Sequence, residues 1–447
     1  MEIVIKLSQF LLSLSLLIVL HELGHFIPAK LFKTRVEKFY LFFDVKFSLL
    51  KKKIGETEYG IGWLPLGGYV KIAGMIDESM DKEQMALPPQ PWEFRSKPAW
   101  QRLIIMLGGV TVNFILAFII YIGIAFYYGE TYVANSELKD GIWVTNPALE
   151  KAGIKNGDKI LSINGVQRER FSDFASDIYM AEEIVVDRNG KQETIKLPVD
   201  IVNQISNSGR RSSVEMRIPF IVIGVEDGSA NAKNLKAKDI ITSINGQPIR
   251  YADEAIAQFD SFKGKTVPVT IKRDNEEIQS TVKFNDSAKL GIAFATRLQA
   301  DNLEKLGLYK ISKHKYGFFE SFPIGIEMGK DKVVGYGQQL KTIFNPKTGA
   351  YKEVGGFFAI FNIFPEQWSW FAFWNITALL SIMLGVMNLL PIPALDGGHV
   401  MFLLFEIISR RKPSEKFMER AQVIGFFILI ALVLFANGND IYKAIVK

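Results

Sequence analysis

Two histidines and a glutamate near the end of the first apolar stretch have the types and spacing of a metal centre. His21, Glu22 and His25 follow a nearly continuous apolar run over residues 3–20. Residues four apart lie on the same face of a helix, so the two imidazoles can hold one metal ion. Glu22 lies one position round the helix, where its carboxylate can reach a water on that metal. Because ionisable groups at membrane depth are costly and usually functional, this stretch indicates a hydrolytic metal centre.

A carboxylate near the other end of the chain can complete this centre. Segment 388–399 contains two prolines and two glycines, which must break the third apolar helix. Asp396 follows the break beside apolar sequence, and a metal held by His21 and His25 would compensate its charge. The alternative is that Asp396 caps a following helix over residues 400–408.

Four apolar segments are long enough, or nearly long enough, to carry these groups across a bilayer. A membrane-spanning helix needs about 20 predominantly apolar residues. The predicted segments cover about residues 3–26, 103–128, 368–390 and 421–436, of which the last is the shortest. The N-terminus has no small-residue cleavage site, so we expect the first segment to be retained. The predicted fold class is a multi-pass α-helical membrane protein with four transmembrane helices.

Basic residues predict the orientation of these segments. They flank the loop between the first two segments and fill the loop before the fourth: Lys30, Lys33, Arg35, Lys38, Arg95, Lys97, Arg102, Arg410, Arg411, Lys412, Lys416 and Arg420. The positive-inside tendency places both loops in the cytoplasm, and therefore both termini and residues 129–367 outside. The net charge of +6 is spread thinly over 447 residues, which predicts no nucleic-acid partner, and the lack of cysteines excludes disulfides and thiolate metal sites.

A glycine-rich stretch in the first loop is predicted as a membrane-associated β-hairpin over about residues 58–72. Its glycines and Pro65 exclude a regular helix, whereas the aromatic and β-branched residues between them favour strands. The stretch is apolar enough to lie against or dip into the membrane, where such backbone is tolerated only when it is buried in protein or lines a cavity. The hairpin is either a packing element or an open edge that accepts a substrate strand. In the second apolar segment, Asn113 is expected to make hydrogen bonds between helices.

The outer region contains an internal repeat. Asp-x-Ile-x-Ser-Ile-Asn-Gly occurs at residues 158–165 and again at 239–246, and a repeat of this size predicts tandem domains. Both copies resemble PDZ domains, α+β modules that we place at 129–218 and 219–298. Strand addition of a peptide and a size filter that binds no chain end are equally compatible with them. Residues 1–128 then hold the first two transmembrane helices, 299–366 a linker and membrane-proximal region, and 367–447 the last two helices.

Taken together, the motifs resemble those of the site-2 protease family of intramembrane zinc metalloproteases. The resemblance is carried by His-Glu-x-x-His at 21–25 and by Asn-x-x-Pro-x-Pro-x-Leu-Asp-Gly-Gly-His at 388–399. With Pro-Leu-Gly-Gly-Tyr-Val-Lys at 65–71 and the PDZ pair, it is closest to the bacterial RseP type (regulator of sigma-E protease). It covers essentially the whole chain. Gly108-Gly109-Val110 and Gly356-Phe357 depart from it, because a Gly-Pro pair is common at both places.

The resemblance implies a role for each motif. Zn²⁺ would be held by His21, His25 and Asp396, with Glu22 as the catalytic base. Substrate would be held by the hairpin and by the turn after the third span, at Gly67, Gly68, Tyr69, Val70, Asn388, Pro391 and Pro393. The implied function is regulated intramembrane proteolysis of single-span membrane proteins, such as anti-sigma factors and remnant signal peptides, in the bacterial cytoplasmic (inner) membrane. The implied partners are these substrates, membrane lipid and peptides bound by extracytoplasmic PDZ domains.

Two other functions fit parts of the sequence. A catalytically silent PDZ membrane scaffold would bind chains without cutting them, but such a protein has no need of Glu22. A transporter could use a discontinuous third helix and a midplane ion site. The four apolar segments show no inverted repeat, and transport does not require the His-Glu-x-x-His motif.

Overall fold

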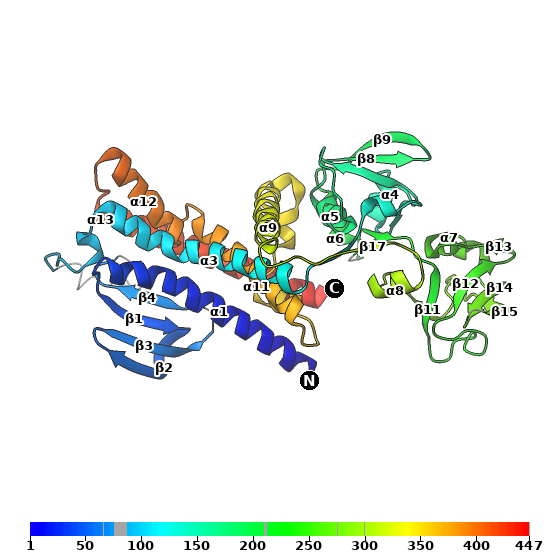
Figure 1. Ribbon diagram of the computed structural model, residues 1–447, viewed down its shortest axis with the longest axis horizontal. Coiled ribbons are helices and arrows are strands. Elements are labelled where there is room, and N and C mark those ends of the chain that lie inside the picture. The colour runs from blue at the N-terminus through cyan, green and yellow to red at the C-terminus, as the bar shows by residue number, and fades with distance from the viewer. Residues whose placement is uncertain (66, 76–86, 210–211, 275, 299, 447) are drawn as a thin grey trace. The chain divides into compact units, whose positions relative to one another are not determined.

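The computed structural model consists of two compact units, shown in Figure 1. It describes residues 1–65, 67–75, 87–209, 212–274, 276–298 and 300–446. The helical unit comprises Met1–Gly129, Lys315–Leu340 and Val354–Lys447, and the β-rich unit comprises Glu130–His314 and Lys341–Glu353.

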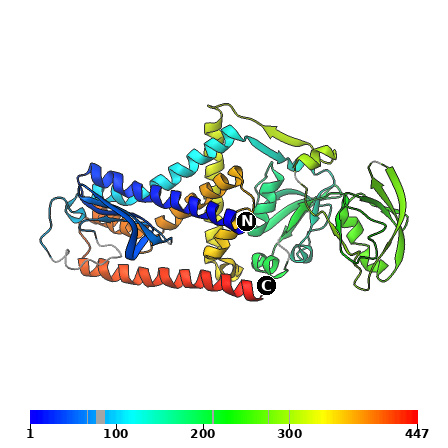
Figure 2. The ribbon, with the colours of Figure 1, turned by 90° about the horizontal axis from the view of Figure 1, so that it is seen from below.

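All four predicted apolar segments form helices in the helical unit. Among the described residues, four helices are long and apolar enough to cross a membrane: α1 (Glu2–Leu31), α3 (Ala99–Tyr127), α11 (Trp370–Leu389) and α13 (Glu415–Val446). The prediction for α13 was too short, because its polar flanks continue the helix at both ends. Figure 2 shows α13 along the edge of the unit, and only 11% of its apolar window is buried.

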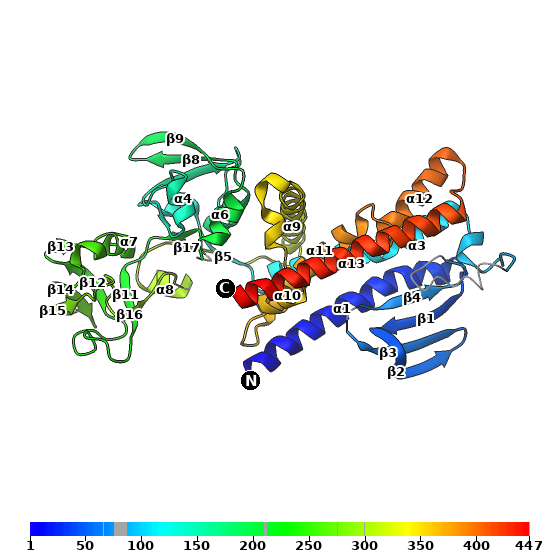
Figure 3. The same cartoon turned by 180° about the vertical axis from the view of Figure 1, so that it is seen from behind.

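The helical unit also contains η1 (Phe94–Ser96), α10 (Phe357–Ile363), α12 (Asp396–Ser409) and most of α9 (Ser321–Phe344). Figure 3 shows α10 beside the C-terminal part of α13. There the N–H groups of Gly356 and Ala359 donate to Asp440 Oδ2 at 2.9 and 3.0 Å. The N–H of Phe357 donates to Asn437 Oδ1 at 3.2 Å, a bond that a proline could not make. One departure from the family motif is therefore matched by a partner on α13.

Two glycines let α1 and α3 approach closely beside the histidine motif. A Cβ on Gly24 would lie 2.4 Å from the carbonyl oxygen of Gly108, and a Cβ on Gly108 would lie 1.9 Å from that of Gly24. Small residues at such crossings are the usual means by which membrane helices bring their backbones together. The crossing brings α3 into contact with the turn of α1 that carries His21 and His25.

The predicted hairpin over residues 58–72 is wrong in its topology. The segment contains β3 (Thr57–Leu64) and β4 (Tyr69–Ile72), but these strands do not pair with each other. They belong to a sheet of order β2-β3-β1-β4, with β1 (Val36–Leu41) parallel to β3 and antiparallel to β4, and β2 (Phe43–Ile54) antiparallel to β3. The parallel pairing of β1 with β3 joins segments separated by β2, so no local turn signal announces it. β4 is an edge strand of this sheet.

A small apolar core fixes this sheet to the helices. It joins residues of α1, β1, β4, η1 and α3 with two residues of α12: Ala29, Val36, Ile72, Phe94, Ile105, Met106, Val400 and Leu403. Aromatic contacts add to it, since the rings of Phe26 and Phe39 meet edge to face at 5.5 Å. Figure 1 shows the sheet alongside the C-terminal half of α1. The edge strand β4 is thereby held beside the histidine motif.

The β-rich unit contains two separate hydrophobic cores. The first is built around β5 (Glu130–Val133), β6 (Ile142–Val144), α4 (Pro147–Lys151), β7 (Lys159–Ile163), α5 (Phe171–Asp177), η3 (Ile178–Met180), β8 (Glu183–Arg188), β9 (Lys191–Lys196), α6 (Ile201–Asn207), β10 (Val214–Met216), α8 (Ala300–Lys305) and β17 (Ile311–His314). The second is built around β11 (Phe220–Val225), β12 (Ile240–Ile244), α7 (Ala252–Ile256), η4 (Phe259–Phe262), β14 (Thr266–Arg273), β15 (Glu276–Lys283) and β16 (Ile292–Phe294). Short elements complete the unit: η2 (Asn135–Glu137), β13 (Gln247–Pro248), η5 (Pro346–Thr348) and η6 (Ala350–Glu353).

The sequence repeat has the same structural role in both cores. Asp158 is buried and accepts two hydrogen bonds of 2.8 Å from Arg188, and Asp239 is buried and accepts two of 2.7 Å from Arg273. The Asn-Gly pair that ends each repeat has positive φ angles, 50° and 74° in the first copy and 50° and 77° in the second. This is the backbone of a tight turn after a strand, which Asn-Gly favours. The repeat is thus a strand bounded by a buried ion pair and a turn.

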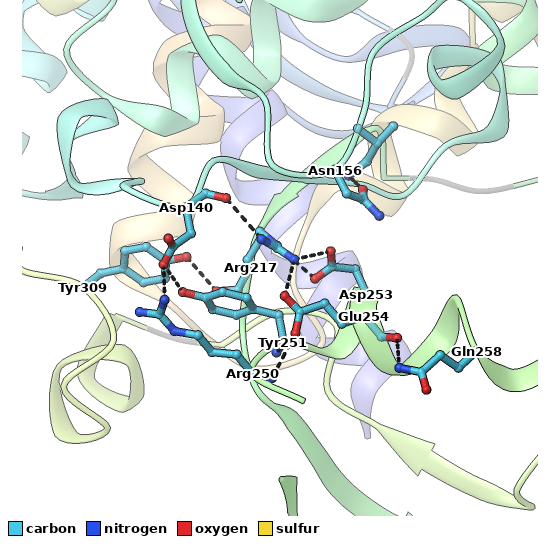
Figure 4. A network of polar contacts seen from close by, with 10 residues as sticks. Asp140, Asn156, Arg217, Arg250, Tyr251, Asp253, Glu254, Gln258 and Tyr309 are labelled. Carbon is cyan, nitrogen blue, oxygen red and sulfur yellow. Dashed lines mark hydrogen bonds and ion pairs between the residues drawn. The ribbon is translucent and has the colours of Figure 1, made fainter. Parts of the chain in front are cut away.

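A polar network joins the two cores, as Figure 4 shows. Arg217 donates to both carboxylate oxygens of Asp253, at 3.1 and 2.7 Å, and to Glu254 at 2.9 Å. The hydroxyl of Tyr251 donates to Asp140 at 2.5 Å. Burial first, and then the hydrogen bond to Asp140, raise the pKa of Tyr251, so this hydroxyl stays protonated and remains a donor at neutral pH. The network therefore holds the two parts of the β-rich unit, each built around one core, in contact with each other.

Candidate metal centre

The structure brings His21, His25 and Asp396 together from two helices that are far apart in sequence. The Nε2 atoms of the histidines lie 3.3 Å apart, and Asp396 Oδ2 lies 3.4 Å from that of His21 and 3.3 Å from that of His25. A tetrahedral site with metal–ligand distances of about 2.0–2.1 Å has edges of about 3.3–3.4 Å. Among the described residues, this is the group found with the donors to hold a metal ion.

The chemistry of this donor set fits a divalent metal. Asp396 Oδ2 is buried and, apart from the two imidazoles, has no partner among the described residues. Both histidines are buried as well, at 8% and 7% exposure. A buried carboxylate oxygen that faces two imidazole nitrogens needs a cation to compensate it. The three side chains together offer two nitrogens and one oxygen, a set that zinc prefers, with a fourth position for water or substrate.

The helix break predicted before Asp396 is present, but it is shorter than the glycines suggested. α11 ends at Leu389 and α12 begins at Asp396, so Gly397 and Gly398 lie within the first turn of α12. The N-cap of α12 is Leu395, and no side chain caps the helix. The alternative that Asp396 is a capping residue is therefore wrong. Its carboxylate faces the histidines of α1 instead.

The remaining polar contacts of the imidazoles come from α3 and α11. His25 Nδ1 donates to the carbonyl of Ile105 at 2.8 Å, which leaves its Nε2 lone pair facing the other donors. Asn113 lies 3.0 Å from His21 Nδ1, so the predicted hydrogen bond between helices is present and involves a proposed ligand. We call the three atoms His21 Nε2, His25 Nε2 and Asp396 Oδ2 the donor triangle. Asn388 Nδ2 lies 3.5 Å from His21 Nε2, at the edge of this triangle. Gly109 lies directly against both rings, because a Cβ there would be 2.3 Å from His25 Nε2 and 2.6 Å from His21 Cε1.

A cavity of about 520 Å³ opens onto the donor triangle. It is lined by residues of α1, the sheet, α3, α12 and α13, and by the loop before α12: His21, Glu22, His25, Lys38, Phe43, Asp44, Gly68, Tyr69, Val70, Lys71, Ile72, Met75, Met106, Ala394, Leu395, Asp396, His399 and Gln422. Four predicted site residues thus line the cavity beside the ligands: Glu22, Gly68, Tyr69 and Val70. The predicted substrate residues Gly67, Asn388, Pro391 and Pro393 are not among the lining residues, although Pro391 and Pro393 lie in the loop that leads to Asp396.

The wall of the cavity contains a polar cluster that sequence reasoning missed. The hydroxyl of Tyr69 donates to Asp44 at 2.8 Å, and Lys38 lies 3.4 Å from that hydroxyl. Burial, followed by the hydrogen bond to Asp44, raises the pKa of Tyr69, which keeps its hydroxyl protonated. The rings of Tyr40 and Tyr69 stack at 5.4 Å. The sequence named Lys38 only as a basic residue of the loop and Tyr69 only as a substrate residue. Neither these two nor Asp44 carries a motif that predicts the cluster.

Comparison with known proteins now identifies the family. The profile of peptidase family M50 matches residues 9–432. The chain belongs to this family. It is similar to three proteins each described as a "putative zinc metalloprotease", from Rickettsia conorii (26% identical, 98% of both chains), Clostridium perfringens (27%, 96% of this chain and 97% of that one) and Fusobacterium nucleatum (29%, 96% of both). A solved PDZ domain of an SdrC-like protein from Listeria monocytogenes is 27% identical, with a TM-score of 0.17, and covers 19% of this chain and 90% of that one.

Membership of the family agrees with the resemblance found in the motifs. The chain is a zinc metalloprotease of the M50 (site-2 protease) type, and its helices mark it as a membrane protein. Zinc is its cofactor.

Proposed function

We propose that this M50 metalloprotease cleaves peptide bonds within or near the transmembrane segments of single-span membrane proteins. The observation that carries the proposal is the position of the donor triangle. It lies between helices apolar enough to span a membrane and opens onto a cavity walled by the edge strand β4. A protease that acts on soluble chains has no need to place its metal among such helices, since polar groups there are costly.

In this proposal His21, His25 and Asp396 hold the zinc, and Glu22 is the catalytic base. Bound zinc supplies Lewis-acid polarisation of the peptide carbonyl and lowers the pKa of water from about 15.7 towards 7. Glu22 lines the same cavity, so its carboxylate can take a proton from the attacking water and pass it to the leaving amine. The Ile105 carbonyl holds the proton of His25 on Nδ1, which keeps Nε2 available as a donor.

The substrate would bind as an extended strand along β4. A transmembrane helix satisfies its peptide groups internally, so it must unwind before a bond can be cut. β4 pairs on one side with β1, and its other edge has no strand partner among the described residues. Gly67, Gly68, Tyr69 and Val70 would therefore take over the peptide hydrogen bonds of the unwound segment. Asn388, with Pro391 and Pro393 in the turn after α11, would hold the chain near the metal.

The β-rich unit and the orientation complete the proposal. The two cores would be PDZ domains at 129–218 and 219–298 that bind peptides or exclude substrates with bulky outer domains, followed by the linker and membrane-proximal region 299–366. Basic residues flank the inner ends of α1 and α3, so the PDZ domains would face outwards from the bacterial inner membrane. Natural substrates would then be anti-sigma factors and remnant signal peptides in regulated intramembrane proteolysis, in contact with surrounding membrane lipid.

The proposal is tested with the purified full-length chain in lipid vesicles that contain a single-span model substrate. Mass spectrometry of the products locates the cut. The proposal expects a cut within the span or its boundary, loss of cutting with a zinc chelator, and recovery with added zinc. Cutting confined to a soluble tail of the substrate would contradict it. Zinc binding without any cutting, combined with capture of peptides by the β-rich unit, would favour the catalytically silent scaffold.

A further inference from the structure

Asn113 is the buried polar side chain of α3 that faces the proposed metal centre. It is fully buried, at 0% exposure, and its amide nitrogen lies 3.0 Å from His21 Nδ1. Its amide oxygen is also buried and has no hydrogen-bond partner among the described residues. An amide that buries one unsatisfied atom loses free energy on folding, so this arrangement needs an explanation.

The geometry of the donor triangle determines which amide atom of Asn113 should face Nδ1 of the His21 ring. His21 directs Nε2 at His25 and Asp396, and a metal ligand must present an unprotonated nitrogen. A neutral imidazole with a free Nε2 carries its proton on Nδ1, so the partner of Nδ1 must be an acceptor. An amide nitrogen cannot accept, whereas the amide oxygen can. Exchange of the two amide atoms by a half-turn of the side chain gives Nδ1 an acceptor and the amide oxygen a donor without changing the shape of the site. The amide nitrogen then takes the position that the oxygen had.

We infer that Asn113 is a positioning residue that accepts the Nδ1–H of His21 and so directs Nε2 to the zinc. The inference rests on the proposed ligand set. It parallels the bond from His25 to the Ile105 carbonyl, so that α3 orients both histidines of α1. Asn113 is itself held in place, because Ser381 of α11 donates to its backbone carbonyl at 2.7 Å.

Three variants of the full-length protein test this inference. Asn113→Leu keeps the size but removes the acceptor, Asn113→Asp keeps an acceptor and removes the donor, and Thr377→Val is the matched control. Thr377 is also fully buried, but it pairs with Ser13 at 2.9 Å and is not part of the metal centre. The readouts are the zinc dissociation constant from chelator competition and the visible spectrum after cobalt replaces zinc, which reports ligand geometry.

The inference expects Asn113→Leu to weaken zinc binding by about 10–100-fold and to alter the cobalt spectrum, as losses of such supporting hydrogen bonds do. Asn113→Asp and Thr377→Val should stay close to wild type in both readouts. Wild-type affinity and spectrum in Asn113→Leu would overturn the inference. Loss of zinc in Asn113→Asp as well as in Asn113→Leu would also overturn it, because the donor rather than the acceptor would then matter. Failure of wild type to bind zinc would instead overturn the proposed ligand set.

Discussion

The three proposed ligands of the metal centre are positioned in two ways: the histidines by the geometry of one helix, and Asp396 by the tertiary fold. Spacing of four on a helix fixes the common face of the two histidines before any tertiary structure forms. Asp396 was predicted from the helix break beside it, but its distance from the histidines could not be, since a long stretch of chain separates them. The contact of Asn113 was predicted only as a hydrogen bond between helices. Its partner depended on how α3 crosses α1, which no local pattern encodes.

At the level of single residues, Asp396 and His399 should respond differently to truncation. Both line the cavity, but only Asp396 belongs to the donor triangle. Asp396→Ala should weaken zinc binding by roughly two orders of magnitude or more, because one of three protein ligands is lost. His399→Ala is the control and should retain zinc. Chelator competition measures both, and equal zinc affinity in the two variants would show that the ligand set is wrong.

The aspartate of the second repeat should contribute stability that depends on pH. Burial acts to raise the pKa of Asp239, but hydrogen bonds from Arg273 and from the Lys236 N–H outweigh it and leave the pKa below its ordinary 3.8. A lowered folded-state pKa gives stability that is present above the unfolded-state value and is lost as the pH falls through the folded-state value. At neutral pH, Asp239→Asn should therefore destabilise this core by about 1–3 kcal/mol.

Hydrogen exchange of residues 219–298 in the full-length protein checks this prediction. The difference between wild type and Asp239→Asn should be largest near pH 7 and should shrink below pH 3.8. Asp227→Asn, at an exposed position within residues 219–298, serves as the control and should leave the hydrogen exchange unchanged. A difference that grew towards low pH would contradict the assigned role of the carboxylate.

At the level of elements, the apolar helices were predicted well and the sheet poorly. Each long helix is announced by its own run of apolar residues, which needs no partner to be read. The sheet instead depends on β1, which inserts between β3 and β4, and on β2, whose lysine-rich second half hides its strand character. The glycines at 60, 62, 67 and 68 correctly excluded a helix, but they could not show which strands are neighbours.

The crossing of α1 and α3 should be sensitive to a single added methyl group. Gly108→Ala would place a Cβ 1.9 Å from the backbone oxygen of Gly24, so the helices must separate. Overpacking of this kind typically costs about 1–3 kcal/mol, and here it should also weaken zinc binding, because α3 carries the Ile105 carbonyl and Asn113. Gly123→Ala, on the same helix with nothing within 4 Å, is the control. Thermal unfolding and zinc affinity measure the two effects. Equal unfolding temperatures and equal zinc affinities in Gly108→Ala and Gly123→Ala would refute the account of the crossing.

At the level of the whole molecule, the orientation can be tested directly because the chain contains no cysteine. Lys52→Cys on β2 and Glu277→Cys on β15 each introduce one exposed thiol. In intact bacterial spheroplasts, a membrane-impermeant thiol reagent should label Glu277→Cys and leave Lys52→Cys unlabelled until the membrane is opened. This follows from the basic loops beside α1, α3 and α13. The opposite labelling pattern would place the β-rich unit in the cytoplasm and exclude the proposed outer role of the PDZ domains.

The central claim is that a zinc-dependent protease acts inside the membrane with Glu22 as its base. The most direct measurement compares cleavage of a membrane-embedded substrate by wild type and by Glu22→Gln, with zinc content determined on the same samples. The substitution keeps the shape of the side chain and removes its basicity. We predict about one zinc per chain in both proteins, cleavage by wild type, and a loss of cleavage in Glu22→Gln of at least about 100-fold, the scale of a lost general base. Equal cleavage by both proteins would contradict the account.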